Sequence, residues 1–96
     1  MTENPKVVEC NTMLGRKLFL TFSNGEERIF DVLPYIAKGG VFSYLVDWKE
    51  FYKVSVINGG YGIEWESGAD LSRDTLYLVS EAFIHPAKKK RDAANP

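Results

Sequence analysis

The sequence predicts an α+β fold: a mostly antiparallel sheet of about five strands with one main helix near the C-terminus. Two Asn-Gly pairs, at 24–25 and 58–59, each lie between segments of alternating polar and apolar residues, which is the pattern of a β-hairpin. Ser72 is a good helix N-cap, and apolar residues with helical spacing follow it. With 96 residues, 45% of them hydrophobic and 14% aromatic, the chain can build one core and not two.

Three strands are expected at the start of the chain. Residues 6–12 alternate weakly and residues 17–22 alternate clearly, and the Asn-Gly pair at 24–25 favours a tight turn because both residues tolerate positive φ. Residues 26–32 should then run back antiparallel. The expected apolar face of the first two strands consists of Val8, Cys10, Leu18, Leu20 and Phe22.

The middle of the chain indicates short helical turns. Residues 33–40 suit one or two of them, with Pro34 at the first helical position and a Gly-Gly pair at the end. Phe42 and Leu45 are three residues apart, as in another turn, and Asp47 can cap a further one.

A second hairpin and a helix follow. Its strands are residues 51–57 and 61–66, and the helix that begins after Ser72 should end near His85, because the residue before a proline avoids helical angles. The expected apolar positions are Tyr52, Val54 and Val56 on one strand, Tyr61, Ile63 and Trp65 on the other, a Leu71 and Leu76 staple, and a helical stripe of Leu76, Val79 and Phe83.

The chain divides into a single domain, residues 1–85, and a disordered basic tail, residues 86–96. The tail carries Lys88, Lys89, Lys90 and Arg91 against Asp92, a charge of +3. Because the whole chain has a net charge of −1, residues 1–85 carry −4 and the body is mildly acidic.

Cysteine usage and hydropathy indicate the compartment. One cysteine, Cys10, excludes an internal disulfide, and one histidine leaves no Cys/His zinc cluster, so we expect neither metal nor cofactor. No apolar run approaches the roughly 20 residues that span a bilayer, and the N-terminus lacks the basic and apolar regions of a signal peptide. We expect a cytoplasmic protein.

The stretch from Trp65 to Asp70 has two interpretations. As the joint between strand and helix, it places Trp65 in the core, gives Gly68 a positive φ, and lets Asp70 bond to backbone groups at the helix start. As a binding site, it would present Trp65 and Asp70 to a ligand. The joint is favoured because Trp65 shares a strand face with Tyr61 and Ile63.

No residue pattern predicts catalysis. Histidine suits acid–base chemistry near neutral pH, but no nucleophile can be matched to His85 by spacing, and it is expected to contact the last carbonyls of the helix. Cys10 lies among valines, as an inert buried thiol would. Glu64 and Glu66 point to the side of their strand away from the core. We expect no enzymatic activity.

Short motifs along two thirds of the chain, residues 18–81, resemble the bacterial domain-of-unknown-function family 2442. The pattern comprises an apolar strand, a Phe-x-Asn/Asp-Gly-Glu turn, a Phe-Asp pair, a Leu-x-Asp-x-x-x-Phe segment and a closing Trp-x-x-Gly-x-Asp-Leu-x-x-Asp-x-Leu-Tyr. The matching positions are Phe22, Asn24, Gly25, Glu26, Phe30, Asp31, Leu45, Asp47, Phe51, Trp65, Gly68, Asp70, Leu71, Asp74, Leu76 and Tyr77. Glu66 stands where the family often has a proline.

The resemblance implies a small bacterial or phage α+β domain with no established activity and no catalytic residues. It also implies two kinds of organisation: some members carry a helix-turn-helix domain after this one, and many stand alone and pair, in antitoxin fashion, with a small neighbour. Here a short basic tail follows residue 85 in place of the DNA-binding part.

Three hypotheses for function follow. The first is a non-enzymatic module that binds another small protein in a regulatory or toxin–antitoxin-like pair, through aromatic residues of the irregular middle: Tyr35, Tyr44 and Trp48. The second is nucleic-acid binding by the Lys88–Arg91 run, weakening steeply with salt. The third is a small-molecule sensor with a pocket lined by Trp65 and Tyr77. Edge strands also allow a homodimer.

Overall fold

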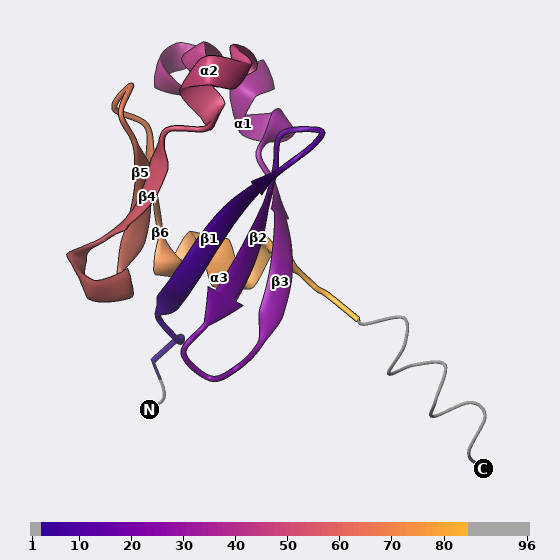
Figure 1. Ribbon diagram of the computed structural model, residues 1–96, viewed down its shortest axis with the longest axis vertical. Coiled ribbons are helices and arrows are strands. Elements are labelled where there is room, and N and C mark those ends of the chain that lie inside the picture. The colour runs from indigo at the N-terminus through magenta and orange to yellow at the C-terminus, as the bar shows by residue number, and fades with distance from the viewer. Residues whose placement is uncertain (1–2, 85–96) are drawn as a thin grey trace, which may run out of the picture.

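The computed structural model describes residues 3–84, and Figure 1 shows their arrangement. Two antiparallel sheets, short helical segments and a helix near the C-terminus confirm the predicted α+β class. Within residues 3–84 the strands number seven, divided between a four-stranded and a three-stranded sheet, where the sequence indicated about five. The two extra strands are very short, which explains why no periodicity announced them.

The larger sheet has the strand order β1-β2-β3-β7. Its strands are β1 (Val7–Met13), β2 (Lys17–Phe22), β3 (Glu27–Asp31) and β7 (Glu81–Ala82). Alternation in β2 works as predicted, because Leu18, Leu20 and Phe22 are all buried. At the β2–β3 turn Gly25 has a φ of 88°, while Asn24 contributes its side chain, which accepts a hydrogen bond from the Glu26 backbone N–H.

Strand β1 departs from the expected facing. The pairing register with β2 shifts between Val7 and Glu9, as at a β-bulge. The strict alternation of side chains between the two faces of the sheet is interrupted at this point. Val7 is therefore buried, whereas Val8, which was expected on the apolar face, is 62% exposed. Cys10 beyond the bulge packs against the core as predicted.

Three helical segments form a unit at one end of the sheets, at the top of Figure 1. They are α1 (Leu33–Lys38), the 3-10 helix η1 (Gly40–Val46) and α2 (Trp48–Phe51), and we call them together the cap. The predicted signals hold: Pro34 lies in the first turn of α1, and the Asp47 side chain accepts a hydrogen bond from the Lys49 N–H to begin α2.

The smaller sheet has the order β4-β5-β6. Its elements are β4 (Val54–Ile57), the 3-10 turn η2 (Asn58–Gly60), β5 (Gly62–Trp65) and β6 (Asp70–Ser72). Tyr52 and Tyr61 were expected on strand faces but lie outside the strands and are exposed. Gly60 has a φ of 100°, and a Cβ there would lie 2.5 Å from the Val7 carbonyl oxygen, so glycine lets this sheet approach β1.

Helix α3 (Arg73–Val79) connects β6 to β7 and packs on the core. Ser72 caps it as predicted, accepting a hydrogen bond from the Thr75 N–H, and Leu71 and Leu76 are both buried, as a staple requires. The prediction that the helix continues to His85 is wrong within the described residues, because Ser80 ends it and the chain pairs with β3. Phe83 consequently lies beyond β7, against Phe19, and Val79 is 57% exposed.

Candidate functional site

The cap carries a concentration of exposed apolar side chains. Four of the eleven exposed large apolar residues in the described chain belong to the cap, a fifth, Tyr52, directly follows α2, and a sixth, Leu14, lies in the loop that precedes Arg16, which contacts η1. The four in the cap are Leu33, Val41, Tyr44 and Val46. Isolated exposed apolar residues need no explanation, but a group on one unit is typical of an interaction surface.

The three aromatic residues predicted as contacts occupy different environments. Tyr44 is 62% exposed and is the one that presents most of its ring to solvent. Tyr35 is half-buried, with its ring 5.5 Å from those of Phe30 and Phe42, so it fastens α1 to β3 and η1. Tyr44 is thus the member best placed to meet a partner.

Trp48 is half-buried and belongs to an aromatic stack. Its ring is 5.4 Å from that of Phe51 in a stacked orientation and 4.6 Å from that of Tyr52 edge-on. The Arg16 guanidinium lies 4.8 Å from the centroid of Trp48. One face of the stack is therefore closed by a cation, and Tyr52 forms the exposed edge.

Arg16 was not singled out from the sequence, yet it holds the cap to the sheet. Its Nε donates to the Leu45 carbonyl oxygen at 3.0 Å, and a second guanidinium nitrogen donates to the Val46 carbonyl. It adopts a positive φ of 61°, which is uncommon for a residue other than glycine. The Arg16 contacts involve residues about 30 positions later, so no local pattern could have revealed them.

The stretch from Trp65 to Asp70 is a structural connection. Trp65 is 1% exposed, and its Nε1 donates to the Phe51 carbonyl oxygen at 3.0 Å, which confirms the core interpretation. Gly68 has the predicted positive φ, 108°, and its N–H donates to the Trp65 carbonyl. Asp70 begins β6 opposite Glu64, where its side chain is exposed, so the stretch joins two strands before the helix starts.

A second unpredicted network closes the end of α3. The Tyr77 hydroxyl and the Asn24 amide both donate to Glu26 Oε2, at 2.6 and 2.7 Å, and Arg28 donates to Oε1 at 2.9 Å. The pKa of Glu26 is lowered mainly by the hydrogen bond from Tyr77 and next by that from Asn24. The pKa of Tyr77 is raised mainly by its hydrogen bond to the same carboxylate. Arg28 also donates to the Ser80 Oγ at 2.8 Å and to the Ser80 carbonyl oxygen at 2.7 Å.

Tyr77 and Trp65, paired in the sensor hypothesis, lie in different surroundings. Tyr77 lines an open hollow with Glu3, Asn4 and Asn24, among others, and Trp65 is not among its lining residues. Trp65 instead packs against Phe42 and Phe51 in the core.

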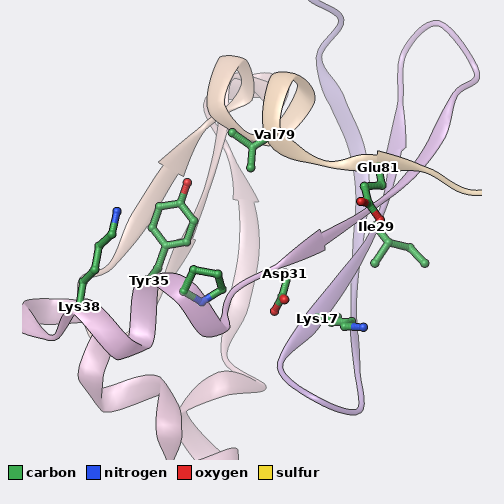
Figure 2. A pocket seen from close by; sticks show the side chains of 8 residues that line it. Lys17, Ile29, Asp31, Tyr35, Lys38, Val79 and Glu81 are labelled. Atoms are coloured by element: carbon green, nitrogen blue, oxygen red, sulfur yellow. The ribbon is translucent and has the colours of Figure 1, made fainter.

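A hollow of about 330 Å³ lies between α1, β3 and the end of α3 (Figure 2). Its lining residues are Lys17, Ile29, Asp31, Pro34, Tyr35, Lys38, Val79 and Glu81. Figure 2 shows Tyr35 and Lys38 rising from α1 on one side, with Asp31, Ile29 and Glu81 on the sheet side and Val79 above them. This hollow adjoins the cap, because α1 belongs to both.

Chemically reactive groups are few in the described chain. Cys10, predicted to be buried, is half-buried, and burial raises the pKa of its thiol to about 12, so the thiol is protonated at neutral pH. Within residues 3–84 no three His, Cys, Asp or Glu side chains gather as a metal site. No helix in that range is long and apolar enough to cross a membrane. His85 and the Lys88–Arg91 run lie outside the described residues.

Comparison with protein families gives a match over most of the chain. A family model described as "Protein of unknown function (DUF2442)" matches residues 12–81. Searches of curated proteins and of solved structures give no match. Several motif residues have structural roles here: Trp65 and Phe51 lie in the core, Asp47 caps α2, and Glu26 and Tyr77 join the β2–β3 turn to α3.

Proposed function

This chain belongs to the DUF2442 family of proteins of unknown function, and from that premise we propose that it is a non-enzymatic module that binds another small protein through the cap. The observation that carries the proposal is the group of exposed apolar residues on the cap, of which Tyr44 and Val46 are the most exposed. Transfer of apolar surface out of water is the main favourable term in protein association. The pairing is regulatory or toxin–antitoxin-like, and it takes place in the cytoplasm.

Charge favours a basic partner. Residues 1–85 carry a net charge of −4, which attracts a basic protein over long range and raises the rate of encounter. The cap itself is formally neutral, because Lys38 and Lys49 stand against Asp47 and Glu50. Charge thus steers the encounter, and apolar contact at the cap holds the complex.

The test is a pull-down of the tagged full chain from its native cytoplasm, washed at low and at high salt, with bound proteins identified by mass spectrometry. We expect one small protein to remain at both salt concentrations. The double variant Tyr44→Ser/Val46→Ser should lose it. The matched control Val8→Ser/Leu78→Ser, which alters two exposed apolar residues away from the cap, should retain it.

Other outcomes contradict the proposal in defined ways. Retention of the partner by Tyr44→Ser/Val46→Ser would exclude the cap as the contact surface. Recovery of nucleic acid alone, and only at low salt, would transfer the function to the Lys88–Arg91 run. Self-association without any second protein, measured by light scattering, would make the partner a second copy of the chain.

A further inference from the structure

The four-stranded sheet has one edge that is only partly covered. Strand β7 pairs with β3 at two positions, Arg28 with Ala82 and Ile29 with Glu81. The β2–β3 pairing continues further, to Asp31 opposite Lys17. One end of β3 therefore extends past the strand that covers it.

The hydrogen-bond alternation shows which groups are left open there. The Val32 N–H donates to the Arg16 carbonyl on the β2 side, and the Phe83 N–H donates to the Glu27 carbonyl on the β7 side. In an antiparallel strand the backbone N–H and C=O of one residue point to one neighbouring strand, and those of the next residue point to the other. The N–H and C=O of Asp31 therefore point to the β7 side. If the β3–β7 pairing continued beyond Ile29 and Glu81, Val79 would lie opposite Asp31. Val79 belongs to helix α3, so no strand of the described residues lies opposite Asp31.

The open position coincides with the hollow of Figure 2. Asp31 is one of the lining residues, and the volume of about 330 Å³ is at the lower end of the range of pockets that enclose ligands. Tyr35 on α1 and Val79 at the end of α3 give it apolar walls, and Ile29 lines it from the other face of β3. A strand entering here would find both a backbone to pair with and a place for an apolar side chain.

The charges of the lining select among ligands. Lys17 and Lys38 are balanced by Asp31 and Glu81, so the formal charge of the lining is zero. A neutral lining does not favour a nucleic acid, a phosphate ester or a strongly charged peptide. It suits an uncharged extended segment whose polar groups are those of the backbone.

We propose that this hollow accepts an extended, apolar segment of the partner protein, which pairs with Asp31 as a continuation of the β7 position and inserts a side chain between Tyr35 and Val79. The proposal rests on the proposed function, since the segment belongs to the partner that contacts the cap. One open residue between α1 and β7 gives too little edge for the sheet of a second folded copy, so the occupant is a loop or a chain end.

The first test isolates the backbone donor. The full chain is panned against a phage-displayed library of linear peptides, and the enriched peptide is synthesised and titrated. Asp31→Pro removes an N–H that the fold does not use, whereas Asp31→Ala removes the carboxylate, which accepts a hydrogen bond from the Leu33 N–H, and keeps the donor. We expect Asp31→Pro to weaken peptide binding by about tenfold and Asp31→Ala to change it much less.

A second pair keeps the test decisive if Asp31→Pro fails to fold. Val79→Arg places a long side chain in the hollow, and Leu78→Arg makes the same change at an exposed neighbour that does not line it. Peptide binding should be lost in Val79→Arg and kept in Leu78→Arg. Equal binding by both variants, or a library that enriches no peptide, overturns the proposal.

The cap variant separates this proposal from the proposed function. If the enriched peptide is lost with Tyr44→Ser/Val46→Ser and kept with Val79→Arg, the peptide binds the cap and the hollow has no such role. If the native partner is lost with the cap variant and unaffected by Val79→Arg, the proposed function stands and the strand-accepting hollow is excluded. Peptide binding at the hollow with no protein recovered from the cytoplasm would overturn the proposed function and the assignment of the segment to that partner, and it would support the hollow as a site for an extended peptide.

Discussion

Arg16 and Arg28 each hold a helical segment against the four-stranded sheet, one at the cap and one at the end of α3. Each guanidinium lies 4.8 Å from an aromatic centroid, that of Trp48 or of Tyr77. Each also donates to backbone carbonyl oxygens, Arg16 to two in η1 and Arg28 to that of Ser80.

The surroundings of the two arginines differ. Arg28 forms an ion pair with Glu26, which also accepts hydrogen bonds from Tyr77 and Asn24, so that end is completed by its own polar contacts. Within residues 3–84 Arg16 forms no ion pair, and the cap that it holds carries exposed apolar residues of its own. The end of α3 satisfies its own hydrogen bonds, so it gains little free energy from binding a partner. The cap exposes apolar surface, and covering that surface with a partner would be favourable.

The largest expected effect comes from removing the core anchor of the cap. Trp65→Ala deletes the ring that packs against Phe42 and Phe51, and we expect a loss of roughly 3–5 kcal/mol in unfolding free energy. Urea denaturation measures it. Trp65→Phe keeps a ring but loses the hydrogen bond to the Phe51 carbonyl, so its loss should be smaller. Equal losses in the two variants would mean that the hydrogen bond, and not the packed ring, anchors the cap.

The next prediction compares the arginines directly. Arg16→Met leaves the Leu45 and Val46 carbonyls without a donor and should cost about 1–2 kcal/mol, with little dependence on salt, because no ion pair is lost. The loss for Arg28→Met should shrink as salt is added, because part of it is the attraction to Glu26. Unfolding at low and high salt distinguishes them. A salt-dependent loss for Arg16→Met would contradict the contrast drawn between the two ends.

A pH profile sharpens the account of the α3 end. The lowered pKa of Glu26 means that its contribution to stability is complete above the ordinary carboxyl pKa and disappears as pH falls through the lowered value. The raised pKa of Tyr77 means that its contribution is complete below the ordinary phenol pKa and disappears as pH rises through the raised value. The stability difference between the native chain and Tyr77→Phe should therefore be largest between these limits and narrow at both extremes. A difference independent of pH would contradict the shared hydrogen bond.

The smallest expected effect on stability is at the exposed cap. Tyr44→Ser should change the unfolding free energy by no more than about 0.5 kcal/mol, as should Val8→Ser on β1, because both side chains are largely exposed. The two variants should differ in partner binding alone, which only Tyr44→Ser weakens. A large loss of stability in Tyr44→Ser would assign this residue to the fold instead of to a partner.

Local sequence was enough for much of the fold. Alternation in residues 17–22, the Asn-Gly turns and the Ser72 cap predicted both hairpins and the start of α3, and short motifs predicted the family. For the candidate site, the sequence directed attention to the middle of the chain and to Tyr44. It did not separate the exposed Tyr44 from the half-buried Tyr35 and Trp48. Tyr35 is covered by Phe30 of β3, and Trp48 is covered by Arg16 of the β1–β2 loop, and both contacts are distant in the sequence.

What the sequence by itself determined is the identity of the five longest strands, the turns and the helix start, because these depend on side chains within a few residues of one another. The tertiary structure alone decided the bulge that exposes Val8, the early end of α3, the two arginine contacts and the open position at Asp31. Each of these depends on pairing between segments distant in the chain. A strand pattern specifies which face is buried, but the fold specifies which edge is left uncovered.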